Sequence, residues 1–144
     1  MLNFLQISPS LSCCGQPSAE DFKSISKDFE VVINLGLADQ DYSLADEKSV
    51  VENLQMEYHH IPVLFDNPTI ADIEQFFALM KNNNEKKILV HCAANYRASV
   101  FVALYLFAIN KLEEDEIGNF IRDVWMPDQN WELFTEEAIN LIRK

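Results

Sequence analysis

The chain has 144 residues, of which 49% are hydrophobic and 24% charged, and its formal net charge is −12 at pH 7. This length and composition predict one folded domain over residues 1–144 and argue against a disordered or fibrous chain. The excess of 23 acidic over 11 basic residues argues against binding to nucleic acid or to anionic membranes, because their phosphates would be repelled. A small anionic substrate would need a local positive site, which Arg97 with a helix N-terminus could supply, and the oligomeric state stays open.

The three cysteines, Cys13, Cys14 and Cys92, are too few and too unevenly placed for a disulfide framework. Their number favours a reducing, cytoplasmic setting. The N-terminal residues lack the basic region and long apolar core of a signal peptide. The longest apolar run, residues 98–109, is shorter than the roughly 20 residues needed to span a bilayer.

In chain order, segments with strand-like and helix-like patterns alternate. We expect a strand at 4–7, a helix at 18–27, a strand at 31–35, a helix at 45–56, a strand at 58–64, a helix from Thr69 to the asparagines at 82–84, a strand at 87–90, helices at 97–110 and 113–124, and a last helix from Asp128 or Asn130 to Ile142. This alternation predicts an α/β fold, with a mostly parallel central sheet flanked by helices. Ligands of such sheets bind beyond the carboxyl ends of the strands, and Cys92 follows one of those ends.

The segment around Cys92 is the most informative part of the sequence. The apolar residues Ile88–Val90 lead into His91 and Cys92, and a short loop then reaches Arg97 and an apolar helix. At a helix N-terminus, unpaired backbone N–H groups and the helix dipole favour negative charge. This environment favours the thiolate, which is the nucleophilic form of cysteine, and the same N–H groups can bind phosphate.

These residues resemble the signature loop of the cysteine-dependent protein tyrosine and dual-specificity phosphatases. His91, Cys92, Arg97 and Ser99 carry the resemblance. Segments 15–18, 32–35 and 58–63 are similar to a small bacterial branch of that superfamily, so the resemblance spans about residues 5–109. It implies a cysteine phosphatase-like fold, a small anionic or phosphorylated substrate and a reaction that needs no cofactor.

The resemblance also implies a role for each of these side chains. Cys92 would attack phosphorus and form a phosphocysteine, while Arg97 would bind two phosphoryl oxygens. Asp66 would protonate the leaving oxygen, and Ser99 would help to expel the thiolate in the second step. Apart from the resemblance, we expect His91 to orient the loop or to tune Cys92 by hydrogen bonding.

The loop departs from the phosphatase pattern because four residues, rather than five, separate Cys92 from Arg97. The expected phosphate-binding segment comprises Ala93, Ala94, Asn95, Tyr96, Arg97 and Ala98. Ala98 occupies the position at which the family has arginine, while Ser99 is in register. Asn95 replaces the usual glycine, and asparagine tolerates the positive φ of a tight turn better than most residues.

Three alternatives follow from this departure. The shorter loop resembles that of single-domain rhodaneses, which would make Cys92 the carrier of a persulfide sulfur and would not need Asp66. A phosphate-binding pseudophosphatase is the second alternative, suggested by Ala98. In the third, Cys92 is an ordinary small core residue and Arg97 is a surface residue at a helix end.

The other candidate residues have plainer interpretations. His59, His60 and His91 show no metal-ligand spacing, and we expect no metal. Cys13 and Cys14 are expected to be structural, with a disulfide to Cys92 on oxidation as the alternative. Trp125, Trp131 and Phe134 have helical spacing and are expected in the core, although one could form a wall of the pocket. Asp128 is expected to cap a helix, with a second catalytic acid as the alternative.

Overall fold

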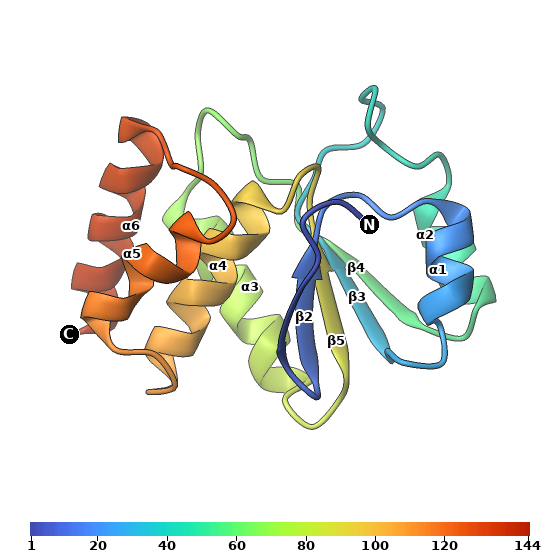
Figure 1. Cartoon of the computed structure of the whole chain (residues 1–144), viewed down its shortest axis with the longest axis horizontal. Helices are drawn as coiled ribbons and strands as arrows, with labels where there is room; N and C mark the ends of the chain where they lie inside the picture. Colours follow the sequence, from blue (N-terminus) through green and yellow to red (C-terminus); the bar gives the residue numbers. More distant parts are fainter.

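The computed structural model describes residues 1–144 and contains one five-stranded sheet (Figure 1). Its strands are β1 (Leu5–Ser8), β2 (Leu11–Cys14), β3 (Val31–Asn34), β4 (Glu57–His60) and β5 (Ile88–His91). They lie in the order β1-β2-β5-β3-β4. Only β1 and β2 pair antiparallel, and the other three pairs are parallel. The sheet is therefore mostly parallel, as the sequence predicts.

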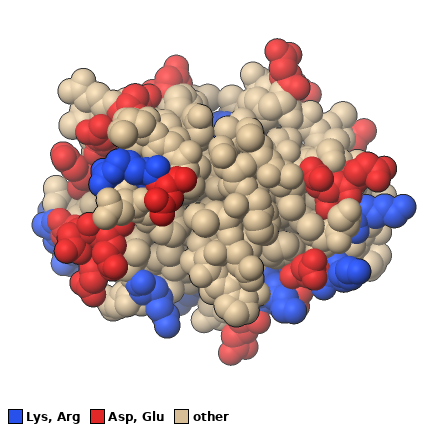
Figure 2. Space-filling model, viewed as in Figure 1, with Lys and Arg blue, Asp and Glu red and all other residues tan.

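Helices cover both faces of the sheet (Figure 1). The helices α1 (Ala19–Ile25) and α2 (Glu47–Asn53) lie on one face, and the other face carries α3 (Ile70–Asn82), α4 (Tyr96–Ala108), α5 (Glu114–Arg122) and α6 (Gln129–Ile142). The charged side chains gather over the helices at either side of this view, while the central part over the strands carries few (Figure 2). None of the helices has the length and apolarity that a membrane crossing requires.

Local hydrogen bonds explain where several helices begin. Ser18 and Asp21 form a capping box at α1, and Thr69 and Asp72 form the same box at α3. At α6 the Asp128 carboxylate accepts a hydrogen bond from Trp131 N at 2.9 Å. Asp128 is thus a helix cap, in agreement with the sequence-based expectation.

The sheet separates two hydrophobic clusters of unequal size. The larger contains 26 buried residues and surrounds α4, whose residues 97–104 are all buried. The smaller contains six and lies under α1 and α2. Successive residues of β5 alternate between them, since Val90 belongs to the larger cluster and Leu89 to the smaller.

The sequence-based prediction missed one strand, β2. Its residues, Leu-Ser-Cys-Cys, include no β-branched or aromatic side chain, so local propensity gives no strand signal. The strand forms because all four residues are buried between β1 and β5. The helix expected at 45–56 begins only at Glu47, because Asp46 has a left-handed backbone with φ 55°.

Candidate active site

Cys92 lies at the carboxyl edge of the sheet, directly after β5. Cys92 is completely buried, and its backbone N–H donates to Cys14 O at 3.3 Å. It packs in the larger hydrophobic cluster. The sheet therefore fixes the backbone of Cys92 at the base of the loop that follows it.

The loop after Cys92 turns into α4 at Asn95. This residue has φ 71° and ψ 4°, a left-handed backbone that asparagine adopts more readily than most other residues. The turn allows α4 to begin at Tyr96, one residue before Arg97. Four residues are thus enough to connect Cys92 to the arginine.

Most backbone N–H groups of residues 93–98 have no partner in the chain. Those of residues 93, 94 and 96–98 donate no hydrogen bond, whereas that of Asn95 faces Cys14 O in the antiparallel bridge between Gly15 and Ala94. The last of these belong to the first turn of α4, where N–H groups have no intrahelical partner. A run of unpaired N–H groups at a helix N-terminus is suited to binding an anion.

The Arg97 side chain is buried beside this loop. Its residue is 5% exposed, and its guanidinium carbon lies 5.8 Å from the Tyr42 ring centre and 5.9 Å from that of Phe65. Nη1 donates to Val63 O at 2.8 Å and Nη2 contacts Tyr42 Oη at 3.4 Å, whereas Nε is buried without a partner. Arg97 is therefore not the surface residue that the plainest alternative requires.

His91 and Glu47 form a buried pair on the opposite face of the sheet. His91 Nε2 lies 2.6 Å from Glu47 Oε2, and His91 Nδ1 lies 3.1 Å from Cys92 O. Glu47 Oε1 also accepts a hydrogen bond from Gln16 Nε2 at 2.7 Å. Both ring nitrogens of His91 therefore have a polar partner, and these two contacts fix the orientation of the ring.

Ser99 and Asp66 lie in the region of the loop but form no hydrogen bond with the Cys92 thiol. The Ser99 residue is completely buried, and its hydroxyl donates to Tyr96 O at 2.7 Å. Asp66 is exposed and follows Phe65, whose ring contacts Arg97. Neither side chain forms a hydrogen bond with Cys92, so the structure brings both into the region of the loop without joining them to the thiol.

Aromatic side chains form a wall beside the loop. The Tyr96 and Trp125 rings are stacked, with centroids 4.5 Å apart and an interplanar angle of 4°. Phe65 packs against Trp125 at 5.7 Å. Trp131 and Phe134 are buried in the core as expected, whereas Trp125 lies in the connection between α5 and α6.

The remaining cysteines and histidines have structural contacts. Burial raises the pKa of Cys13 to about 12 and also raises the pKa of Cys14, and all three cysteines are free thiols. His60 Nε2 lies 2.7 Å from Gly36 O, and His59 Nε2 lies 2.6 Å from Glu57. No three His, Cys, Asp or Glu side chains are grouped in a way that could hold a metal ion.

Sequence reasoning did not identify Glu47 or Asn3 as part of this region. Glu47 is an acidic residue in the first turn of a helix, a common pattern, and its contact with His91 joins residues 44 positions apart. A pocket of about 580 Å³ lies beside Glu47 and Gln16, between β4 and residues 37–48. Cys92 and Arg97 do not line that pocket, so it is separate from the loop.

A comparison with models of protein families identifies the family of this chain. A family model described as "DSP-PTPase phosphatase fused to NAD+ Kinase" matches residues 10–130. The chain belongs to this DSP-PTPase phosphatase family. The comparison with curated proteins gives no match.

Solved structures extend this result. A DUF442 protein from Shewanella putrefaciens CN-32 is 30% identical, with a TM-score of 0.90 over 99% of this chain and 94% of that chain. Tk-PTP in its active form is 19% identical, with a TM-score of 0.81 over 94% and 95% of the two chains. TpbA of P. aeruginosa is 15% identical, with a TM-score of 0.79 over 99% and 89%. These likenesses confirm the cysteine phosphatase-like α/β fold.

Proposed function

We propose that this chain is a cysteine-dependent phosphatase that hydrolyses a phosphate monoester through a phosphocysteine on Cys92. One observation carries the proposal: the unpaired backbone N–H groups of residues 93, 94 and 96–98 lie in the same loop and first helical turn as Arg97, whose buried Nε also has no partner. Buried donors are normally satisfied, so this arrangement suits an oxyanion with several acceptor oxygens. A phosphoryl group has that chemistry.

In the first step, the Cys92 thiolate attacks phosphorus. The S–P bond forms as the ester P–O bond breaks, and the carboxylic acid of Asp66 gives its proton to the leaving oxygen. In the second step, water attacks phosphorus, Asp66 takes the proton from that water, and the S–P bond breaks to restore the thiolate. The Ser99 hydroxyl turns from Tyr96 O to donate a hydrogen bond to the departing sulfur.

Arg97 supplies a fixed positive charge to both steps. Its Nη1 is bonded to Val63 O, which leaves Nε and the weakly bound Nη2 to donate to two phosphoryl oxygens. Such a paired contact is geometrically specific and is not available to lysine. The contact of the guanidinium with Tyr42 and Phe65 limits its movement.

Two structures with a similar fold contain phosphorylated ligands. One TpbA structure is a complex with pTyr, and one PTPMT1 structure is a complex with PI(5)P. We propose that this chain also acts on a small phosphorylated group, and that its net charge of −12 disfavours strongly anionic protein partners. Its three free cysteines suit a reducing, cytoplasmic compartment.

Paired turnover assays test the reaction class. Wild type, Cys92→Ser and the matched buried-cysteine control Cys13→Ser are assayed on an aryl phosphate, and on thiosulfate with cyanide. Phosphate release that is lost only in Cys92→Ser supports the phosphatase. Thiocyanate formation without phosphate release, surviving in Asp66→Ala, identifies a sulfurtransferase instead. Phosphate binding without either activity identifies a pseudophosphatase.

A further inference from the structure

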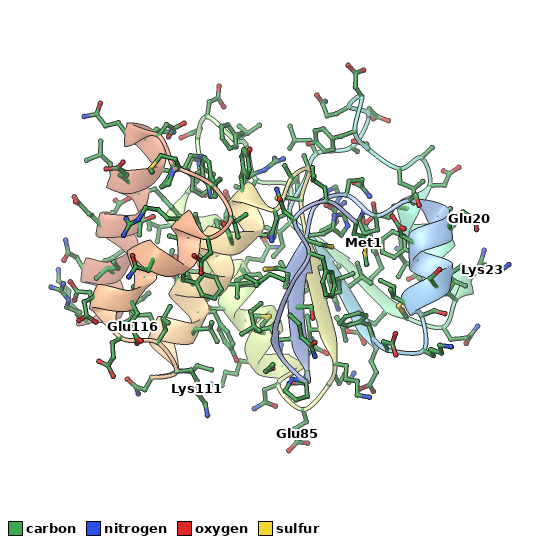
Figure 3. All side chains as sticks on the ribbon, viewed as in Figure 1. Met1, Glu20, Lys23, Glu85, Lys111 and Glu116 are labelled. Carbon is green, nitrogen blue, oxygen red and sulfur yellow. The ribbon has the colours of Figure 1, made fainter.

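The N-terminal residues lie against the Cys92 loop. Gly15 N donates to Leu2 O at 2.7 Å, which places the N-terminal segment beside the end of β2. Figure 1 shows this segment at the carboxyl edge of the sheet, and Met1 is labelled there in Figure 3. The N-terminal segment therefore lies against the Cys92 loop without being part of the connection between β5 and α4 that forms this loop.

Asn3 and Asn95 exchange hydrogen bonds across this contact. Asn3 Nδ2 donates to Ala94 O at 2.9 Å, and Asn95 Nδ2 donates to Asn3 O at 2.8 Å. Both residues have left-handed backbones, with φ 52° for Asn3 and 71° for Asn95. The side-chain amide of each asparagine therefore joins the N-terminal segment to the loop.

The hydrogen bonds to the carbonyl groups of the loop also fix the direction of its N–H groups. In a planar trans peptide unit, the C=O of one residue and the N–H of the next point in opposite directions. Ala93 O accepts from Gln16 N at 2.9 Å, and Ala94 O accepts from the Asn3 amide. The N–H groups of Ala94 and Asn95 therefore point away from these two donors. That of Asn95 faces Cys14 O in the antiparallel bridge between Gly15 and Ala94, whereas that of Ala94 has no acceptor in the chain.

We infer that Asn3 is a positioning residue for oxyanion binding. Its amide holds the Ala94 carbonyl outward, so that the Ala94–Asn95 peptide keeps its place in the bridge between Gly15 and Ala94 and the neighbouring unpaired N–H groups stay directed toward the bound anion. Asn95 returns the contact by bonding Asn3 O. The inference rests on the proposed function for the identity of the anion, but the hydrogen-bonded arrangement of the loop is independent of any turnover.

This contact also explains how a loop without glycine and with only four connecting residues keeps a defined shape. A short loop has few internal hydrogen bonds, and the backbone N–H groups of Ala93 and Ala94 donate none within the chain. The restraint therefore comes from two outside donors, Gln16 N and the Asn3 amide. Preorganised donors bind an oxyanion more tightly than donors that must first be ordered.

The test compares Asn3→Gly with the matched control Asn110→Gly. Glycine accepts a positive φ and keeps the backbone carbonyl, so Asn3→Gly removes only the side-chain donor. Asn110 also has a left-handed backbone, φ 61°, but lies beyond the other end of α4. We measure the dissociation constant for inorganic phosphate, kcat and KM on an aryl phosphate, and the midpoint of thermal unfolding.

Asn3→Gly should weaken phosphate binding about three- to tenfold, the equivalent of one ordinary hydrogen bond, while Asn110→Gly should leave it unchanged. Asn95→Gly should have a similar effect, and the double variant should be weakened less than the product of the two single effects, because the amides act on one loop. Equal phosphate affinity in wild type and Asn3→Gly overturns the inference. A double variant whose phosphate affinity is weakened by the full product of the two single effects also overturns the inference.

The same measurements separate this inference from the proposed function. Wild-type phosphate binding that depends on Asn3, without ester hydrolysis, supports the positioning role and rejects the phosphatase. Ester hydrolysis with phosphate affinity independent of Asn3 rejects the positioning role alone. Failure of the wild type to bind phosphate rejects both. A fall in the unfolding midpoint with unchanged phosphate affinity identifies a merely structural residue and overturns the inference.

Discussion

The two faces of the sheet differ in what they contribute to the Cys92 loop. The face covered by α3–α6 has a cluster of 26 buried hydrophobic residues, and the face covered by α1 and α2 has one of six. Cys92 packs in the larger cluster, whereas the ring of His91 lies 6.0 Å from Phe22 of the smaller one. The end of β5 and the residue after it therefore place Cys92, the proposed nucleophile, on the larger cluster and His91 on the smaller.

The two faces contribute differently to the stability of the fold and to the geometry of the candidate site. The larger cluster contains aromatic contacts among α3, α4 and α6, which stabilise the fold without touching the loop. The smaller face contains a polar contact, in which Glu47 bonds both His91 and Gln16. A buried polar pair is a weak source of stability, and we interpret this one as fixing the orientation of His91 under the loop.

The largest expected effect comes from the larger cluster. Phe101 is completely buried and contacts Phe76, Trp131 and Phe134. Phe101→Ala should lower the free energy of unfolding by about 3–5 kcal/mol, through lost burial and a residual cavity, with kcat of the folded protein preserved. Urea unfolding measures this, with the exposed Leu133→Ala on α6 as control. An equal loss of unfolding free energy in the two variants would contradict the assignment of stability to the larger cluster.

The second effect belongs to the smaller face. Glu47→Gln presents an amide N–H₂ to His91 or Gln16, so one buried donor loses its acceptor and the free energy of unfolding should fall by about 1–3 kcal/mol. Because His91 also contacts Cys92 O, kcat should fall about tenfold, which corresponds to about 1.4 kcal/mol. The control is Glu52→Gln, an exposed residue of the same helix. A stability loss with unchanged kcat would limit Glu47 to a structural role.

The third prediction concerns alkaline pH. Burial raises the pKa of Cys13 from 9.0 to about 12, above the value in the unfolded chain. The native state therefore keeps a proton that the unfolded state loses, and stability should fall as pH rises above 9, by about 1.4 kcal/mol per pH unit for each such thiol. The pKa of Cys14 is raised in the same direction. In urea unfolding at pH 8 to 10, Cys13→Ala should show a shallower decline, and an unchanged slope would refute this assignment.

The smallest effects are expected at two equivalent helix starts, one on each face. Asp21→Asn weakens the capping box of α1 and Asp72→Asn that of α3, and each should cost about 0.5–1 kcal/mol. Hydrogen bonds from Ser18 lower the pKa of Asp21, so its contribution is present above the unfolded pKa and is lost as pH falls through the folded value. Thermal unfolding at pH 7 and pH 3 measures both. A loss for Asp21→Asn that is as large at pH 3 as at pH 7 would contradict the carboxylate's role.

The sequence was sufficient to predict most of the fold, because its helices and parallel strands have strong local patterns. Thr69 with Asp72 marks the start of α3, and the β-branched run at 31–34 marks β3. The strand β2 could not be predicted, since its four residues are ordered by burial between neighbouring strands rather than by propensity. Local patterns do not encode such long-range pairing.

The candidate site could be predicted only where its residues are close in sequence. Cys92, Asn95 and Arg97 are positioned by one strand-to-helix connection, which the sequence shows directly. Asn3 reaches Ala94 from 91 residues away, and Glu47 reaches His91 from 44 residues away. Nothing in the local sequence around either residue distinguishes it from an ordinary loop asparagine or helix-start glutamate.

The most direct test of the central claim is to look for a phosphoryl group on Cys92. Ser99→Ala should slow the departure of the thiolate, so that acid quenching during turnover of an aryl phosphate traps phosphocysteine in the Cys92 peptide, detectable by mass spectrometry. The account predicts that this adduct appears with substrate and is absent from Ser99→Ala carrying Cys92→Ser. Continued phosphate release from the Cys92→Ser protein, with no phosphate on any cysteine, would contradict it.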